Sequence, residues 1–244
     1  MKAMLVVMMM LAAASARADG LADLRAALAK FPAQSPIRAA VTLERQQADD
    51  EHPAAEHGKA TIEAEAGAEG LRVIYANDVV ARAQAETRAQ EADPEKQTPT
   101  ASALREVRAL NLAGVLDGAG ALARTLTNAT LQKDARVAVG GHPARQLTFA
   151  VQPKFSKADA KHIKSAEATL VVTTDAENVP LSADLHGSVK AKFLLMTFEQ
   201  KTHETWSYAR AGDRLVAVQH REEQSGSGFG QNFSVWTATS VMVR

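Results

Sequence analysis

The chain has 244 residues, 28 of them Lys or Arg, 28 Asp or Glu, and none Cys. This length suits one medium-sized domain or two small ones, and the lack of cysteine excludes disulfides, thiol chemistry and thiolate metal sites. The balanced charge excludes the strong positive field that nucleic-acid binding requires, so we expect no nucleic-acid partner.

The N-terminus carries a predicted export signal. Lys2 precedes an unbroken apolar run over residues 4–14, and Ala16-Arg17-Ala18 has the small-x-small pattern that signal peptidase reads. The run is about half of the roughly 20 residues needed to cross a bilayer, which favours a cleaved signal peptide over residues 1–18 rather than a membrane anchor. The alanine-rich composition suits a GC-rich bacterium, and we therefore expect a periplasmic protein that does not span the membrane.

The remaining residues, 19–244, are interpreted as a single domain that begins with a helix and three strands. Apolar residues recur at helical spacing over residues 20–31, where Asp19 can cap the start and Pro32 the end. Alternating apolar residues then predict antiparallel strands around residues 37–43, 62–66 and 71–75.

The helical period returns in an insertion at about residues 78–130. A polar, proline-containing stretch at residues 91–100 separates a first helix from a second apolar helical run. Gly114, Gly118 and Gly120 are expected to break this second run into shorter helices.

The rest of the chain is strand-like. Gly140-Gly141 predicts a tight hairpin between two strands. Residues 190–208 are long enough to predict one strand with a bend or bulge, and residues 225–230 predict a flexible connection. Further strands are expected at residues 147–151, 167–174, 181–186, 215–221 and 233–243.

These elements predict an α+β fold, in which a curved, mostly antiparallel sheet forms a half-open barrel with a helical lid. A helix laid across the free face of such a sheet can leave an apolar hollow, which would be a ligand site. The apolar residues expected to line that site are Val41, Leu43, Ile62, Val73, Tyr75, Phe149, Leu194, Met196, Phe198, Trp206 and Tyr208.

The layout resembles the LolA/LolB lipoprotein carriers and the lipid-binding domain of RseB. The matching features are the helix that leads into residues 38–44, the hairpin at 59–75, the helical insertion, and the hairpin that leads into Trp206 and Tyr208. The resemblance implies an unclosed, strongly curved sheet that is covered by helices and holds acyl chains. It also implies an early-strand arginine that holds the lid, for which Arg38 is the nearest candidate. The chain departs from the family in its low aromatic content, 5%.

The predicted function is therefore that of a non-enzymatic periplasmic carrier for an apolar ligand, such as a lipoprotein acyl chain or an envelope lipid, without a cofactor. Its partner would be a lipid, a lipidated protein or another envelope protein. The alternative is a regulatory or scaffold domain that has a filled core and docks a protein partner.

Three polar groupings are candidate chemical sites. Residues 49–57 hold two histidines and four carboxylates, but they join two strands without a scaffold that would fix metal-ligand spacing. We therefore expect a solvated hairpin tip there rather than a metal site. Lysines between Lys154 and Lys164 form a basic patch that suits either a solvated surface helix or an anionic headgroup.

The third grouping is a predicted acid–base pair. If the turn at residues 211–213 has three residues, Tyr208 faces Val216, Trp206 faces Val218 and Glu204 faces His220. Such a pair can perform general acid–base catalysis beside a substrate. A Glu–His pair is also common between neighbouring strands of a sheet. Because no nucleophile accompanies this pair, we do not expect the protein to be an enzyme.

Overall fold

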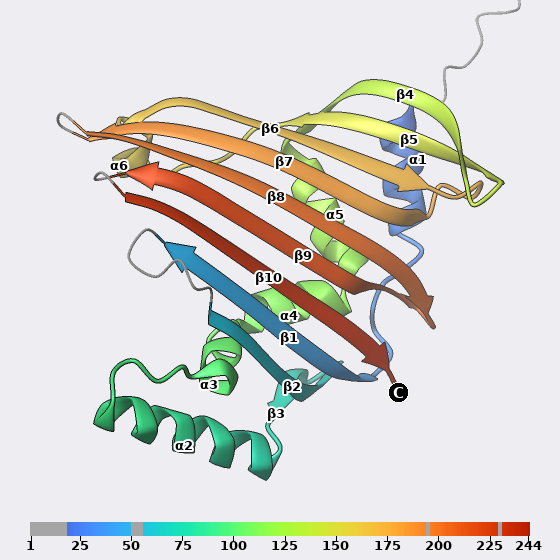
Figure 1. Ribbon diagram of the computed structural model, residues 1–244. Helices are drawn as coiled ribbons and strands as arrows, with labels where there is room; N and C mark the ends of the chain where they lie inside the picture. Colours follow the sequence, from blue (N-terminus) through green and yellow to red (C-terminus); the bar gives the residue numbers. More distant parts are fainter. Residues whose placement is uncertain (1–18, 50–55, 194–195, 229–230) are drawn as a thin grey trace, which may run out of the picture.

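The computed structural model describes residues 19–49, 56–193, 196–228 and 231–244, which form one ten-stranded antiparallel sheet with helices on one side of it (Figure 1). The strands are β1 (Ile37–Asp49), β2 (Glu56–Gly67), β3 (Gly70–Ile74), β4 (Ala129–Val139), β5 (His142–Val151), β6 (Ile163–Thr174), β7 (Pro180–Phe193), β8 (Met196–Ala211), β9 (Arg214–Gly228) and β10 (Gln231–Val243). The helices are α1 (Gly20–Leu28), α2 (Asn77–Ala92), α3 (Pro99–Leu104), α4 (Ala109–Leu116), α5 (Gly118–Thr125), the short 3-10 turn η1 (Leu126–Asn128) and α6 (Lys157–Ala160). The predicted α+β class with a curved antiparallel sheet is confirmed.

The sheet is open, and its strand order is β3-β2-β1-β10-β9-β8-β7-β6-β5-β4. Its two edge strands, β3 and β4, are consecutive in the chain, and helices α2 to α5 connect them. The first and last strands, β1 and β10, pair in the interior of the sheet, from Ala39 opposite Val243 to Asp49 opposite Phe233.

Strand alternation gives the sheet an apolar inner face and a polar outer face. In β1, Ala39 and Val41 are fully buried and Leu43 is 3% exposed, whereas Arg38 and Thr42, at the alternate positions, point outward. Figure 1 views the sheet from its outer face, with α1, α4 and α5 lying behind the strands.

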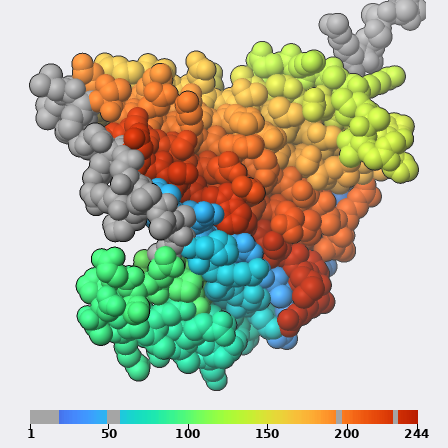
Figure 2. All heavy atoms as spheres, viewed as in Figure 1, coloured from blue at the N-terminus to red at the C-terminus, as the bar shows by residue number. Residues whose placement is uncertain are grey.

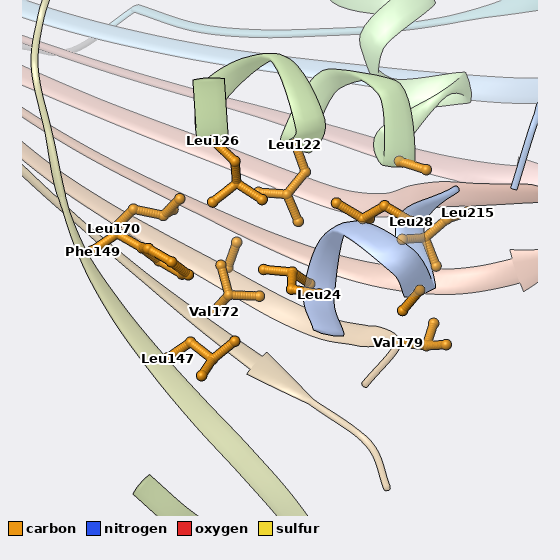
Figure 3. Close-up of a cluster of buried hydrophobic side chains, with 13 residues drawn as sticks. Leu24, Leu28, Leu122, Leu126, Leu147, Phe149, Leu170, Val172, Val179 and Leu215 are labelled. Atoms are coloured by element: carbon orange, nitrogen blue, oxygen red, sulfur yellow. The ribbon is translucent and has the colours of Figure 1, made fainter. Parts of the chain in front are cut away.

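Helix α1 packs against one half of the inner face. The predicted cap is confirmed, because the Asp19 carboxylate accepts a hydrogen bond from the Leu21 backbone amide at 3.1 Å. The helix ends at Leu28, three residues earlier than expected, since Lys30 and Phe31 donate to carbonyls only three residues back in a tightened last turn. Figure 3 shows the resulting cluster, in which leucines of α1 and the α5 region meet β5 and β6.

Helix α4 packs against the other half. Its buried residues Leu112, Val115 and Leu116 join a second cluster with β1, β2, β9 and β10. Trp206 and Tyr208 of β8 contact both clusters, so they mark the boundary between the two halves.

Strand β4 begins at Ala129, where pairing with β5 starts opposite Val151, so the helical segment ends close to residue 130. Two predictions for later strands were wrong in the same way, because they relied on side-chain pattern alone. Residues 190–208 are not one bent strand: they belong to β7 and β8, which pair antiparallel up to Phe193 opposite Met196. Residues 225–228 continue β9, because β8 and β10 hydrogen-bond to either side of them despite their Gly/Ser composition.

Carboxylates that tie loops and hairpins together should make the protein less stable in acid. Asp213 accepts hydrogen bonds from the Gln34 and Ser35 amides at 2.8 and 3.0 Å, and these bonds hold its pKa below the usual range. The Arg145 guanidinium lowers the pKa of Asp134 in the same direction. Because each pKa is lower in the folded than in the unfolded state, the stabilisation is present above an unfolded value of about 4 and is lost as the pH falls through the folded value.

We therefore expect the urea midpoint to be lower at about pH 3 than at about pH 7. The Asp213→Asn variant should show a smaller difference between the two conditions, because it lacks one of the titrating groups. Equal midpoints for the wild-type protein at the two pH values would contradict this account.

Candidate ligand-binding groove

A groove of about 480 Å³ lies between helices α4 and α5 and the inner face of β8 and β9. This volume falls within the range of ligand pockets, roughly 300–1,000 Å³. The lining residues are Arg108, Leu110, Asn111, Gly114, Val115, Gly118, Ala121, Leu122, Arg124, Thr125, Leu170, Glu204, Trp206, Tyr208, Ala217, His220 and Glu222.

Small residues on the helices keep this groove open. Gly114, Gly118 and Ala121 line it from the helical side. At Gly118 a Cβ atom would lie 2.9 Å from both the Leu215 carbonyl and the Tyr208 ring, so only glycine allows α5 to start this close to the sheet. Asp117 caps α5 by accepting a hydrogen bond from the Gly120 amide at 2.9 Å, which separates α4 from α5 as the glycine spacing predicted.

The floor of the groove contains two aromatic residues of β8. Trp206 stacks on His220 with 5.1 Å between ring centroids and 7° between ring planes. Burial, reinforced by the nearby Glu204 carboxylate, raises the pKa of Tyr208, so this phenol stays protonated and can act as a hydrogen-bond donor.

One end of the groove is polar. His220 Nε2 lies 3.3 Å from Glu204 Oε2, and both side chains are largely shielded from solvent. The pair is brought together, but the predicted register was wrong: Glu204 lies opposite Glu222, and Trp206 lies opposite His220. The β8–β9 turn contains only Gly212 and Asp213, which sets Tyr208 opposite Ala217 rather than Val216. A bulge at Ser207/Tyr208 shifts the pairs beyond it by one more residue, so Trp206 lies opposite His220.

A smaller hollow of about 200 Å³ adjoins the groove and shares Arg108, Asn111, Val115, His220 and Glu222 with it. Arg45 of β1 lines this hollow and forms an ion pair with Glu106, 2.8 Å from Nε to Oε1, in the segment between α3 and α4. This ion pair ties the segment between α3 and α4 to β1. Arg38, the candidate that the resemblance suggested for holding a lid, lies on the outer face, where it pairs with Glu63 and Glu65.

The predicted binding residues are distributed over three environments. Trp206 and Tyr208 line the groove, and Leu43 lines the adjoining hollow. Three others are packed in the core: Val41, Ile62 and Phe149 are at most 1% exposed and lie beneath the helices rather than in the groove.

The remaining predicted residues lie elsewhere. Val73 of β3 is partly buried beside the second cluster, and Tyr75 is 40% exposed just after β3. Phe198 stacks with Phe233 at 6.4 Å between centroids, near the far end of β8. Met196 is the first residue of β8, and Leu194 lies outside the described residues.

The helical side of the groove was not predicted from the sequence. Arg108, Leu110 and Arg124 were assigned no role, although Leu110 is 87% exposed at the groove and the two arginines line it. The glycines among residues 114–120 indicate that the helices pack closely against the sheet. They do not indicate which helical side chains line the groove.

The other two polar groupings lie outside the groove. Residues 50–55 of the charged loop are not among the described residues; His57 lies in β2, 3.6 Å from Glu44, on the outer face.

Of the basic patch, Lys154, Lys157, Lys161 and Lys164 are exposed around α6 and the start of β6. The predicted signal peptide, residues 1–18, also lies outside the described residues.

The sequence matches no protein-family model, and no curated protein is similar enough to count as a relative. Within the described ranges, none of the helices combines the length and apolar character needed to cross a membrane.

Proposed function

We propose that this protein is an exported, periplasmic carrier that holds one apolar chain of a lipid or lipidated protein in the groove beneath α4 and α5. The observation that carries the proposal is the groove itself, about 480 Å³ of space between helices and a curved sheet. The other half of the inner face is filled by the packed cluster of α1, α5, β5 and β6, which argues for one occupied region rather than a hollow as wide as the sheet.

The lining suits an amphiphilic ligand. Leu122, Leu170 and Trp206 offer apolar contact, and the exposed Leu110 at the groove would lose its contact with water when covered. Each methylene group removed from water contributes about 0.8 kcal/mol. Arg108 and Arg124 lie on the helical rim, where their charges can attract an anionic headgroup.

The proposal predicts that the protein takes up lipid and releases it chemically unchanged. Native mass spectrometry of the protein purified from the bacterial envelope should show a species that is heavier by one lipid, and the apo form should bind a fluorescent fatty acid. A ligand-free mass combined with no uptake would contradict the carrier role. One stoichiometric protein partner without lipid would favour the docking alternative.

A second candidate function rests on the Glu204–His220 pair. Both side chains line the groove, as general acid–base catalysis would require, and the donor Tyr208 is beside them. The same mass spectrometry separates the two functions, since an ester-linked lipid recovered intact supports carriage, whereas recovery of its hydrolysis products supports catalysis.

A further inference from the structure

Three potential metal ligands gather on the outer face of β7 and β8. Asp184 and His186 are two residues apart in β7 and therefore share a face, while Ala183 and Leu185 between and beside them pack into the inner cluster. His203 lies directly opposite His186 in β8. The three side chains thus occupy neighbouring positions on a face that helices do not cover, the face that Figure 2 presents.

The donor atoms of these side chains converge. His186 Nε2 lies 2.8 Å from Asp184 Oδ1, and His203 Nε2 lies 3.4 Å from Asp184 Oδ2. All three residues offer a ligand atom within 4.8 Å of the others. In a tetrahedral zinc site with bonds of about 2.0–2.1 Å, neighbouring donor atoms are about 3.3 Å apart, so only small side-chain movements would be required.

Hydrogen bonding between these groups does not fully explain the arrangement. The two imidazole rings stack with 4.1 Å between centroids and 11° between planes, and the Nε2 atoms of both approach the same carboxylate. In addition, Asp184 Oδ1 is buried and forms no hydrogen bond, although His186 Nε2 is within 2.8 Å of it.

A divalent cation would satisfy all three donors at once. Two imidazole nitrogens and one carboxylate oxygen suit zinc and its first-row neighbours, whereas magnesium and calcium prefer oxygen ligands. All three residues are partly exposed, with side-chain exposures of 42% for Asp184, 61% for His186 and 39% for His203, so an ion can reach them from solvent.

We propose that Asp184, His186 and His203 bind one zinc-type transition-metal ion on the outer face of the sheet. Three protein ligands leave at least one coordination position for water or for a group of another molecule. The site lies on the opposite face from the groove and is independent of the proposed carrier function.

The test is a Zn²⁺ titration of the full-length purified protein, prepared without a polyhistidine tag, against a chromophoric chelator. We expect one Zn²⁺ per chain, and the His186→Ala and His203→Ala variants should each bind at least about tenfold more weakly. The His142→Ala variant, which alters an exposed histidine at the start of β5, should bind as the wild-type protein does. Excess Ca²⁺ should not compete.

A Co²⁺ absorption spectrum provides a second readout that does not depend on the variants. Bands in the visible region should appear on addition of Co²⁺ to the wild-type protein and disappear on addition of Zn²⁺. The proposal is overturned if the wild-type protein binds no Zn²⁺, if the double variant of His186 and His203 binds it equally well, or if His57→Ala alone removes the binding, which would assign it to the charged loop.

Discussion

Replacing Ala121 with Trp is expected to abolish the uptake of a fluorescent fatty acid. Ala121 lines the groove from α5, on the side that faces Trp206 and Tyr208. An indole ring at this position would occupy the space in which an acyl chain would lie, and each displaced methylene would forfeit about 0.8 kcal/mol. The measurement is a fluorescence titration, in which we expect affinity to fall by at least about tenfold, the equivalent of 1.4 kcal/mol.

The matched control is Ala123→Trp. Ala123 belongs to the same helix and is exposed, so the same substitution there adds the same ring outside the groove. This variant should take up the probe with wild-type affinity. If both variants bound the probe equally well, the groove would not be the binding site, and if both lost binding, the effect would lie in the stability of α5 rather than in the groove.

Phe149→Ala is expected to cause the largest loss of stability, about 3–5 kcal/mol in the free energy of unfolding. Phe149 is fully buried in β5, where Figure 3 shows it beside Leu170 and facing the leucines of α1 and the α5 region. Its removal would leave a cavity where two helices pack on the sheet, and the cost of this cavity adds to the free energy lost because the ring is no longer buried. Urea denaturation followed by circular dichroism measures the change.

Phe155→Ala is the corresponding control, because Phe155 is 37% exposed in the segment that follows β5. The same change of side chain should lower the unfolding free energy there by under about 1 kcal/mol. A similar loss for both variants would show that the interior around Phe149 relaxes to fill the space, in which case the inner cluster is less rigidly packed than its burial indicates.

The parts of the fold that local sequence patterns encode were predicted. Residue alternation identified β1, the cap at Asp19 identified the start of α1, and Gly140-Gly141 identified the β4–β5 hairpin, in which Val139 pairs with His142. Each of these depends on interactions between residues close together in the chain. The overall class followed because helices and strands are segregated along the sequence.

The arrangement of side chains in the groove depends on the register between β8 and β9, which local sequence patterns do not encode. The two-residue turn and the bulge at Ser207/Tyr208 each shift the pairing by one residue, so Trp206 rather than Glu204 lies opposite His220. For the same reason, the cluster of Asp184, His186 and His203 on the outer face was not predicted. His186 and His203 become neighbours only because residues 190–208 belong to two paired strands, whereas a single long strand would have kept them apart.

The position of β10 between β1 and β9 has a consequence for the order in which the sheet forms during folding. Strands β4 to β9 can pair one after another, because each pairs with the strand that follows it in the chain, and β1 to β3 can pair in the same way. The two groups of strands are joined only when β10 inserts between them. Because this step closes a loop of nearly the whole polypeptide, it is expected to be slow. Until then β1 and β9 each present an unpaired edge that can recruit another chain. During synthesis, therefore, the period before residues 231–243 arrive is when the protein is most exposed to aggregation and has most need of a chaperone.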